Sequence, residues 1–288
     1  MSAPTLGWSG DSRDAGEPGS RMARRTPGRR RTDVVFYVIA AAMVCFALLG
    51  PELAPHDPAE IIGQPYIGPG PSHLLGTDHL GRDVWSRVLA GGRSLLILPF
   101  LATALTAVIG AALGTVAGYL GGWVDRLIGA ITGLLLVIPA VLILLLVIQA
   151  WGYNDLSLVV VVAATGVPFV TRLARASTLR AARSGYVEQA VGFGESTGAI
   201  LAREIAPNIA GPLLADAGMR LVTSMDIIAA AAFLGLGPAA TNWASMVSEN
   251  TEGMTAAPWS VAAPALALAL LAVSVNIAMD RLTKGLIR

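Results

Sequence analysis

The sequence predicts an all-α protein that crosses a membrane several times. Apolar residues make up 54% of its 288 residues, whereas charged residues make up only 14%. A soluble domain has about 25% charged residues, so the low charge indicates that lipid covers much of the surface. The apolar residues gather in six segments, each near the roughly 20 residues that a helix needs to cross the hydrocarbon core. These segments are 34–50, 95–120, 127–150, 156–171, 213–234 and 259–279.

The N-terminal 33 residues differ from the rest of the chain. Residues 1–33 are rich in Gly, Ser, Pro and Arg, a composition that predicts a disordered tail. Arginines gather just before the apolar segment 34–50, an order that a secretory signal peptide also shows. No small-x-small cleavage site follows, and five more apolar segments lie downstream. We therefore interpret 34–50 as an uncleaved first transmembrane helix.

The distribution of basic residues predicts the orientation of the spans. Cytoplasmic loops of membrane proteins carry an excess of Lys and Arg. We therefore expect a protein of the plasma or inner membrane whose arginine-rich N-terminus lies on the cytoplasmic side. Six spans then place the C-terminus there too, together with the polar loop 172–212 and its five arginines. The loop 51–94 falls on the extracytoplasmic side, although it contains Arg82, Arg87 and Arg93. Residues 95–288 would form a core of the remaining five spans.

Glycines recur at every fourth position in the second predicted span. Gly110, Gly114 and Gly118 would lie on one helix face. Glycines at this spacing let two membrane helices approach closely. We expect this face to pack against a neighbouring helix.

Charged residues interrupt the segment 213–234. Asp216 and Arg220 are four residues apart and can pair on one helix face. Asp226 has no such neighbour, and ionisable groups within membrane helices usually serve function. We expect Asp226 to line a polar translocation pathway, and a bond to a neighbouring helix is the alternative.

The sequence contains no recognisable set of catalytic residues. Its three histidines, His56, His73 and His79, are scattered among prolines and glycines of the loop 51–94, without the regular helical spacing of metal ligands. We therefore predict no metal site, no cofactor and no enzymatic activity. The chain also lacks a G-x-x-x-x-G-K-[ST] phosphate-binding loop, so energy for uphill transport would come from a partner or an ion gradient. A stand-alone secondary transporter and an intramembrane enzyme that uses the loop histidines remain alternatives.

The polar cytoplasmic loop predicts two short helices around a glycine corner. Helix start signals place the first helix from Gly185, with Glu188 in its first turn, where the helix dipole favours an acid. Glycine is a poor helix former, so the helix should end near Gly194. A second helix is expected after Ser196, and Pro207 should mark the next turn. Such a shape can dock into a groove on another protein.

This loop resembles the EAA motif of ABC-importer permeases. That pattern is E-A-A, three residues, G, nine residues, then I-x-L-P. The sequence supplies Glu188, Gln189, Ala190, Gly194 and Pro207 at the same intervals. It departs from the pattern at Gln189, Glu204 and Ala206.

Other segments resemble one subfamily, the C-type subunits of dipeptide and oligopeptide permeases. They appear in the expected order as "HLLGTDHLGRDVWSRVLAGGRSLL" (73–96), "GYLGGWVDRL" (118–127), "FLGLG" (233–237), Trp243 with Met246, and "APWSVAAPALAL" (257–268). The resemblance implies the type I, MetI-like permease fold with six transmembrane helices and cytoplasmic coupling helices. It also implies that relatives carry an acid near position 228, where this chain has Ile228.

The resemblance implies a set of partners. They are a second permease subunit that completes a heterodimer, two ATP-binding domains or subunits, an extracytoplasmic binding protein, a peptide substrate and membrane lipid, with no nucleic acid. The coupling loop would meet the ATPase through polar contacts of Glu188 and Arg203, while Ala190 and Gly194 permit close approach. Pro207 completes the motif. The cargo could instead be a nickel chelate or haem, since relatives carry those too.

The loop before the second span holds a further motif of the subfamily. We expect it to form an ordered turn that braces the extracytoplasmic side rather than a substrate site. Its residues are Gly76, Thr77, Asp78, Gly81, Arg82 and Asp83.

Overall fold

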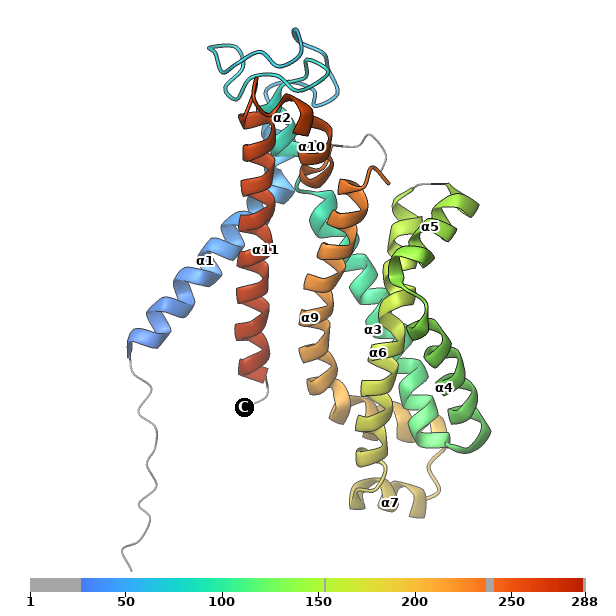
Figure 1. Cartoon of the computed structure of the whole chain (residues 1–288). Helices are drawn as coiled ribbons and strands as arrows, with labels where there is room; N and C mark the ends of the chain where they lie inside the picture. The colour runs from blue at the N-terminus through green and yellow to red at the C-terminus, as the bar shows by residue number, and fades with distance from the viewer. Residues whose placement is uncertain (1–26, 153, 237–240, 287–288) are drawn as a thin grey trace, which may run out of the picture.

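The computed structural model describes residues 27–152, 154–236 and 241–286, and its regular elements there are helices (Figure 1). The all-α prediction is confirmed for these residues. The long helices are α1 (Pro27–Leu49), α3 (Ser94–Leu120), α4 (Gly122–Val137), α5 (Ala140–Trp151), α6 (Asp155–Ala181), α9 (Ala206–Phe233) and α11 (Trp259–Leu286). The short ones are η1 (Gly50–Leu53), α2 (Val84–Ala90), α7 (Gly185–Gly192), α8 (Thr197–Ala199), η2 (Ile200–Ile205), α10 (Trp243–Asn250) and η3 (Thr251–Gly253).

Within the described residues, four stretches of helix are long and apolar enough to cross a membrane. They are Val34–Leu53, Val84–Leu120, Asp155–Ala181 and Trp259–Leu282. The chain is therefore a multi-pass membrane protein. Of the predicted tail 1–33, residues 1–26 lie outside the described part, and residues 27–33 form the first turns of α1.

The predicted span 127–150 is not one straight helix. It divides into α4 and α5, which are bent by 91° at the break between them. Pro139 causes the break, because a proline disfavours helical backbone at the preceding residue. Ile138 accordingly has an extended conformation, with φ −83° and ψ 123°. Counted together as one broken span, α4 and α5 raise the number of apolar spans to five.

The sixth predicted span lies on α9, which is 28 residues long but carries three charged residues. By length and composition alone it does not qualify with the other five. Figure 1 nevertheless shows α9 running between α11 and the α3–α6 pair, and it contacts all three of these helices. Contacts with these spanning helices place α9 at the same depth in the membrane. Its three charged residues explain why its composition alone does not identify it as a span.

The glycine repeat of α3 packs directly on α6, as the sequence predicts. A Cβ atom on Gly110 would lie 2.6 Å from the Val170 Cβ, and one on Gly114 would lie 2.3 Å from the carbonyl oxygen of Thr171. Contacts this short leave no room for a methyl group, so the absence of side chains sets the distance between the two helices.

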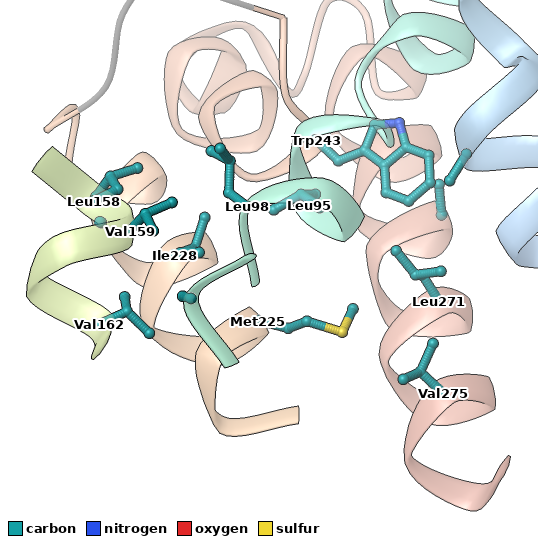
Figure 2. Close-up of a cluster of buried hydrophobic side chains, with 14 of the residues drawn as sticks. Leu95, Leu98, Leu158, Val159, Val162, Met225, Ile228, Trp243, Leu271 and Val275 are labelled. Atoms are coloured by element: carbon teal, nitrogen blue, oxygen red, sulfur yellow. The ribbon is translucent and has the colours of Figure 1, made fainter. Parts of the chain in front are cut away.

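The largest core cluster joins helices that are far apart in the sequence. Figure 2 shows Leu95 and Leu98 of α3, Leu158 of α6 and Leu271 of α11 converging with residues of α9. Trp243 of α10 is fully buried at one end of this cluster. The core therefore links the membrane helices to α10, which lies beside the loop 54–83 at the end opposite α7 (Figure 1).

Candidate functional site

Residues 182–205, here called the α7–η2 segment, connect α6 to α9 at one end of the molecule (Figure 1). The predicted first helix is confirmed as α7, which begins at Gly185 and has Glu188 in its first turn. The second helix begins after Ser196, whose hydroxyl accepts a hydrogen bond from the backbone N–H of Ala199. This bond satisfies one of the free donors at the helix start.

A small apolar cluster holds the two arms of the α7–η2 segment together. Its buried members are Val187, Ala190, Ile200, Ile205 and Ile209. Ala190 is only 6% exposed because it packs inward against η2 and α9. This placement differs from the expectation that Ala190 meets a partner surface. Its small side chain instead allows α7 to approach the rest of its own chain.

Gly194 forms the corner of the segment. Its φ is +75°, a left-handed conformation that favours glycine because it has no Cβ. The N–H groups of Gly194 and Glu195 donate to the carbonyl groups of Val191 and Ala190, at 3.0 and 3.1 Å. These bonds close the end of α7. Nothing lies within 4 Å of the position of a Gly194 Cβ, so the corner faces open space.

The outer surface of this corner combines apolar and charged side chains. Phe193, next to the corner glycine, is 86% exposed, and Val191 is also exposed. Glu188 and Arg203, the residues expected to make polar contacts, are both exposed. An exposed aromatic side chain beside charges is typical of a surface that binds another protein.

The helix that follows the corner runs into α9 without a turn. The prediction that Pro207 marks a turn is wrong: Pro207 lies in the first turn of α9. Proline has no N–H to donate to the preceding turn, and that turn, Ile200–Ile205, is a wider π-helix. Helical backbone continues through Ile200 (φ −60°, ψ −47°) and Ala206 (φ −55°, ψ −45°). The α7–η2 segment is thus attached to α9 by one continuous helical path.

At the opposite end, four charged side chains tie the loop 54–83 to α2 and α10. We call these the loop anchor: Asp78, Arg82, Arg87 and Glu249. Arg82 donates from Nε to Asp78 Oδ2 at 2.7 Å, and Arg87 pairs with the same oxygen. Glu249 accepts from the guanidinium groups of Arg82 and Arg87 at 3.3 and 3.0 Å. Two acids therefore balance the charges of two arginines in the loop anchor.

Burial and hydrogen bonding act in opposite directions on Asp78. Burial by itself would raise the pKa of its carboxyl group, which is fully buried. The backbone N–H of Arg82 and the positive charge of Arg87 outweigh that effect and hold the pKa below its usual value of 3.8. Asp78 therefore stays ionised, which the paired arginines require.

The other motif residues shape the loop around the anchor. Thr77 is buried, and its hydroxyl accepts from the Ile67 N–H at 2.8 Å and donates to the Gln64 carbonyl at 2.7 Å. Asp83 caps α2 by accepting from the N–H of Ser86 at 2.9 Å. Gly76 and Gly81 have φ of +79° and +81°. A Cβ on either would lie within about 2.2 Å of a backbone oxygen, so both positions need glycine.

Two further contacts join the loop and α2 to α10. The N–H of His79 donates to Asn250 Oδ1 at 2.9 Å. Trp243 Nε1 donates to the carbonyl oxygen of Val88 at 2.6 Å. The loop motif is thus part of a buried structural unit. Among the described residues, no three His, Cys, Asp or Glu side chains gather as a metal site would require.

Asp226 lies apart from both of these sites, on an exposed face of α9. Ile228, two residues further along, is only 1% exposed and belongs to the core. Two residues turn a helix by about 200°, so the two side chains point in nearly opposite directions. The carboxyl group of Asp226 therefore points away from the core that buries Ile228. The predicted pair of Asp216 and Arg220 is confirmed, with Arg220 Nε 3.3 Å from Asp216 Oδ2.

Sequence reasoning missed Arg87, Glu249 and Phe193. Arg87 is fully buried. In the sequence, only its place in the motif "GRDVWSR" indicated that it has a structural role. Glu249 lies more than 160 residues from its partners, so no local pattern indicates the pairing. Phe193 stands directly before the corner glycine, but only the fold shows that its ring is exposed.

Comparison with known proteins agrees with this architecture. Residues 110–288 match the family described as "Binding-protein-dependent transport system inner membrane component". The glutathione transport system permease protein GsiD of Escherichia coli O6:K15:H31 is 34% identical over 259 residues, which cover 88% of this chain and 84% of that protein. The dipeptide transport system permease protein DppC of Alkalihalophilus pseudofirmus is 29% identical over 269 residues, covering 92% and 88%.

Solved structures show the same fold. Two structures of inward-facing conformations of the MetNI methionine ABC transporter superpose with TM-scores of 0.52 and 0.54. They cover 68% and 69% of this chain and 94% and 95% of the matched chains, at 18% sequence identity. The family match covers more than half of the chain, and the E. coli permease exceeds 30% identity. The chain therefore belongs to the family of inner membrane components of binding-protein-dependent transport systems.

Proposed function

We propose that this chain is the permease subunit of an ATP-driven importer of short peptides. It forms half of the translocation pathway together with a second, different permease subunit. Two ATP-binding domains, either separate or fused, hydrolyse ATP, and an extracytoplasmic binding protein delivers the cargo. The subunit itself is non-catalytic. Both termini and the α7–η2 segment face the cytoplasm, and the loop 54–83 faces the other side.

The α7–η2 segment carries this proposal. It presents an exposed Phe193 beside Gly194 at its tip, with exposed Glu188 and Arg203 on either arm. Its own apolar cluster makes it a compact unit, and its second arm continues directly into α9. A movement imposed on the tip by an ATPase would therefore be transmitted to α9 as a rigid-body displacement rather than absorbed by a flexible loop.

The charge distribution supports the orientation. The segment 172–212 carries five arginines, and basic residues favour the cytoplasmic side. At the opposite end, the loop anchor leaves Arg82 and Arg87 neutralised by Asp78 and Glu249. These two arginines therefore do not oppose an extracytoplasmic placement of the loop.

The names of the relatives support a peptide cargo. GsiD is named for glutathione transport and DppC for dipeptide transport, and both cargoes are short peptides with free charged groups. If transport assays showed import of a nickel chelate or of haem instead of peptides, the proposed peptide cargo would be wrong.

Association with the ATPase tests the coupling role. We expect Gly194→Trp to abolish co-purification with the ATPase while the chain still inserts in the membrane, because the bulky ring would occupy the open space at the corner. Gly152→Trp is the matched control: Gly152 is exposed at the end of α5, has φ +74°, and also has nothing within 4 Å of a Cβ. Normal ATPase association of Gly194→Trp would refute the coupling role.

A further inference from the structure

A cavity of about 570 Å³ lies between α1, α3, α9 and α11. Its wall extends from Phe100 to Ala107 on α3 and from Leu214 to Leu221 on α9. Seven residues of helix rise about 10 Å, so the cavity is elongated along the membrane helices. Most of the lining side chains are apolar, whereas a buried water needs two to four polar partners. The cavity therefore suits a hydrocarbon chain better than water.

The polar groups of the wall do not change this character, but one of them carries a charge. The Thr103 hydroxyl lies 3.2 Å from the Ser224 hydroxyl and is paired with it. Of the described residues that line the cavity, only Arg281 is charged. Arg281 stands at the end of the apolar stretch Trp259–Leu282, and this end of α11 points toward the side of the molecule where α7 lies (Figure 1). The cavity thus has an apolar interior and a basic rim.

The guanidinium group of Arg281 is held across the gap between α11 and α1. Its central carbon lies 4.4 Å from the ring centre of Phe36, a cation–π contact that uses the flat face of the group. The five N–H donors of a guanidinium lie in its plane, so they serve several oxygen acceptors at once. Arginine binds phosphate through two parallel hydrogen bonds of this kind. The rim is therefore suited to a phosphate group.

We propose that the cavity binds an acyl chain of an anionic phospholipid, with the lipid phosphate at Arg281. Basic pockets between membrane helices on the cytoplasmic side bind anionic headgroups. The helix ends at this rim, residues 27–36 and 279–286, contain five basic residues and two acids, so the local charge also favours an anion. The inference goes beyond the proposed function and takes from it only the orientation, which places the rim in the cytoplasmic leaflet.

Lipid retention by the purified full chain tests the headgroup contact. The chain would be released from nanodiscs that contain equal amounts of phosphatidylglycerol and phosphatidylcholine with the same acyl chains, and native mass spectrometry would identify the retained lipid. We expect phosphatidylglycerol to dominate. Arg281→Gln should lower its ratio to phosphatidylcholine about tenfold, because a hydrogen bond to a charged group is lost, and Arg281→Lys should keep most of the ratio. Arg126→Gln changes an exposed arginine that does not line the cavity and should keep the wild-type ratio.

A second pair of variants tests the cavity itself. Ala104 of α3 lines the cavity and is exposed, so Ala104→Trp should fill the space and remove the retained lipid of either headgroup. Ala112 is exposed on the same helix and does not line the cavity. Ala112→Trp should therefore retain lipid as the wild-type chain does.

These measurements need no transported cargo, so they separate the lipid site from the proposed function. An unchanged lipid ratio in Arg281→Gln would overturn the headgroup contact, and equal retention by Ala104→Trp and Ala112→Trp would overturn the cavity as the site. If the wild-type importer retained no lipid and Ala104→Trp lost the second permease subunit, the cavity would be a subunit interface and the inference would be wrong. A wild-type importer that retains the lipid but imports no peptide would contradict the proposed cargo alone.

Discussion

Arg87 of α2 and Glu249 of α10 form an ion pair at 3.0 Å that joins segments 162 residues apart in the sequence. The same guanidinium pairs with Asp78, so one buried arginine connects the loop 54–83, α2 and α10. Removal of one partner from a buried ion pair leaves an uncompensated charge. The stability of this end of the molecule should therefore depend strongly on Arg87.

Arg87→Met should lower the free energy of unfolding by about 3–5 kcal/mol, the usual cost of a broken buried pair. Thermal unfolding of the purified chain in detergent would measure the change. Arg93→Met is the matched control, because Arg93 is 54% exposed and lies 4.0 Å from Glu52. Such surface pairs contribute about 0–1 kcal/mol. Equal unfolding temperatures for the two variants would show that the loop anchor does not stabilise the fold.

The depressed pKa of Asp78 predicts a loss of stability in acid. Folding lowers this pKa below 3.8, so the folded protein favours the carboxylate more than the unfolded chain does. The contribution is complete above the unfolded value and is lost as the pH falls through the folded pKa. Trp243 contacts α2 in the same region, so tryptophan fluorescence during thermal unfolding between neutral and acidic pH can follow the loss.

Two variants separate Asp78 from the other acids. Asp78→Asn should be less stable at neutral pH and should lose this part of the pH dependence, since it has no carboxyl group to titrate. Asp57→Asn should keep the wild-type profile, because Asp57 is exposed and its carboxyl accepts a bond that an amide oxygen can also accept. A wild-type acid profile in Asp78→Asn would argue against Asp78 as the group that titrates.

The helix pair α3–α6 offers a test of close packing. In Gly114→Ala, the new methyl group would lie 2.3 Å from the Thr171 carbonyl oxygen, so the backbones must separate. We expect destabilisation by about 1–3 kcal/mol, as for other overpacked sites. Gly133→Ala on α4 places its methyl group in open space and should stabilise its helix by about 0.5–1 kcal/mol. Unfolding midpoints of the two variants should move in opposite directions, and a shared direction would contradict the packing argument.

The sequence anticipated the parts of the α7–η2 segment that depend on local chemistry. Glycine, serine and acidic residues act within one helical turn, so the start of α7 and the corner at Gly194 were predictable. The inward direction of Ala190 was not, because Ile200 and Ile209 cover it only after the chain folds back. Pro207 likewise suggested a turn, yet its position in the first turn of α9 depends on how the preceding helix continues.

The sequence by itself determined the helical class, the multi-pass membrane character, the glycine face of α3 and the spacing of the motif from Glu188 to Pro207, because these follow from composition and short-range patterns. Only the tertiary structure decided that α4 and α5 bend by 91°, that Arg87 reaches Glu249, and that Asp226 points away from the core that buries Ile228. These features depend on contacts between distant segments. No local pattern encodes them, since the pairing energy of a buried charge exists only once both partners have been brought together.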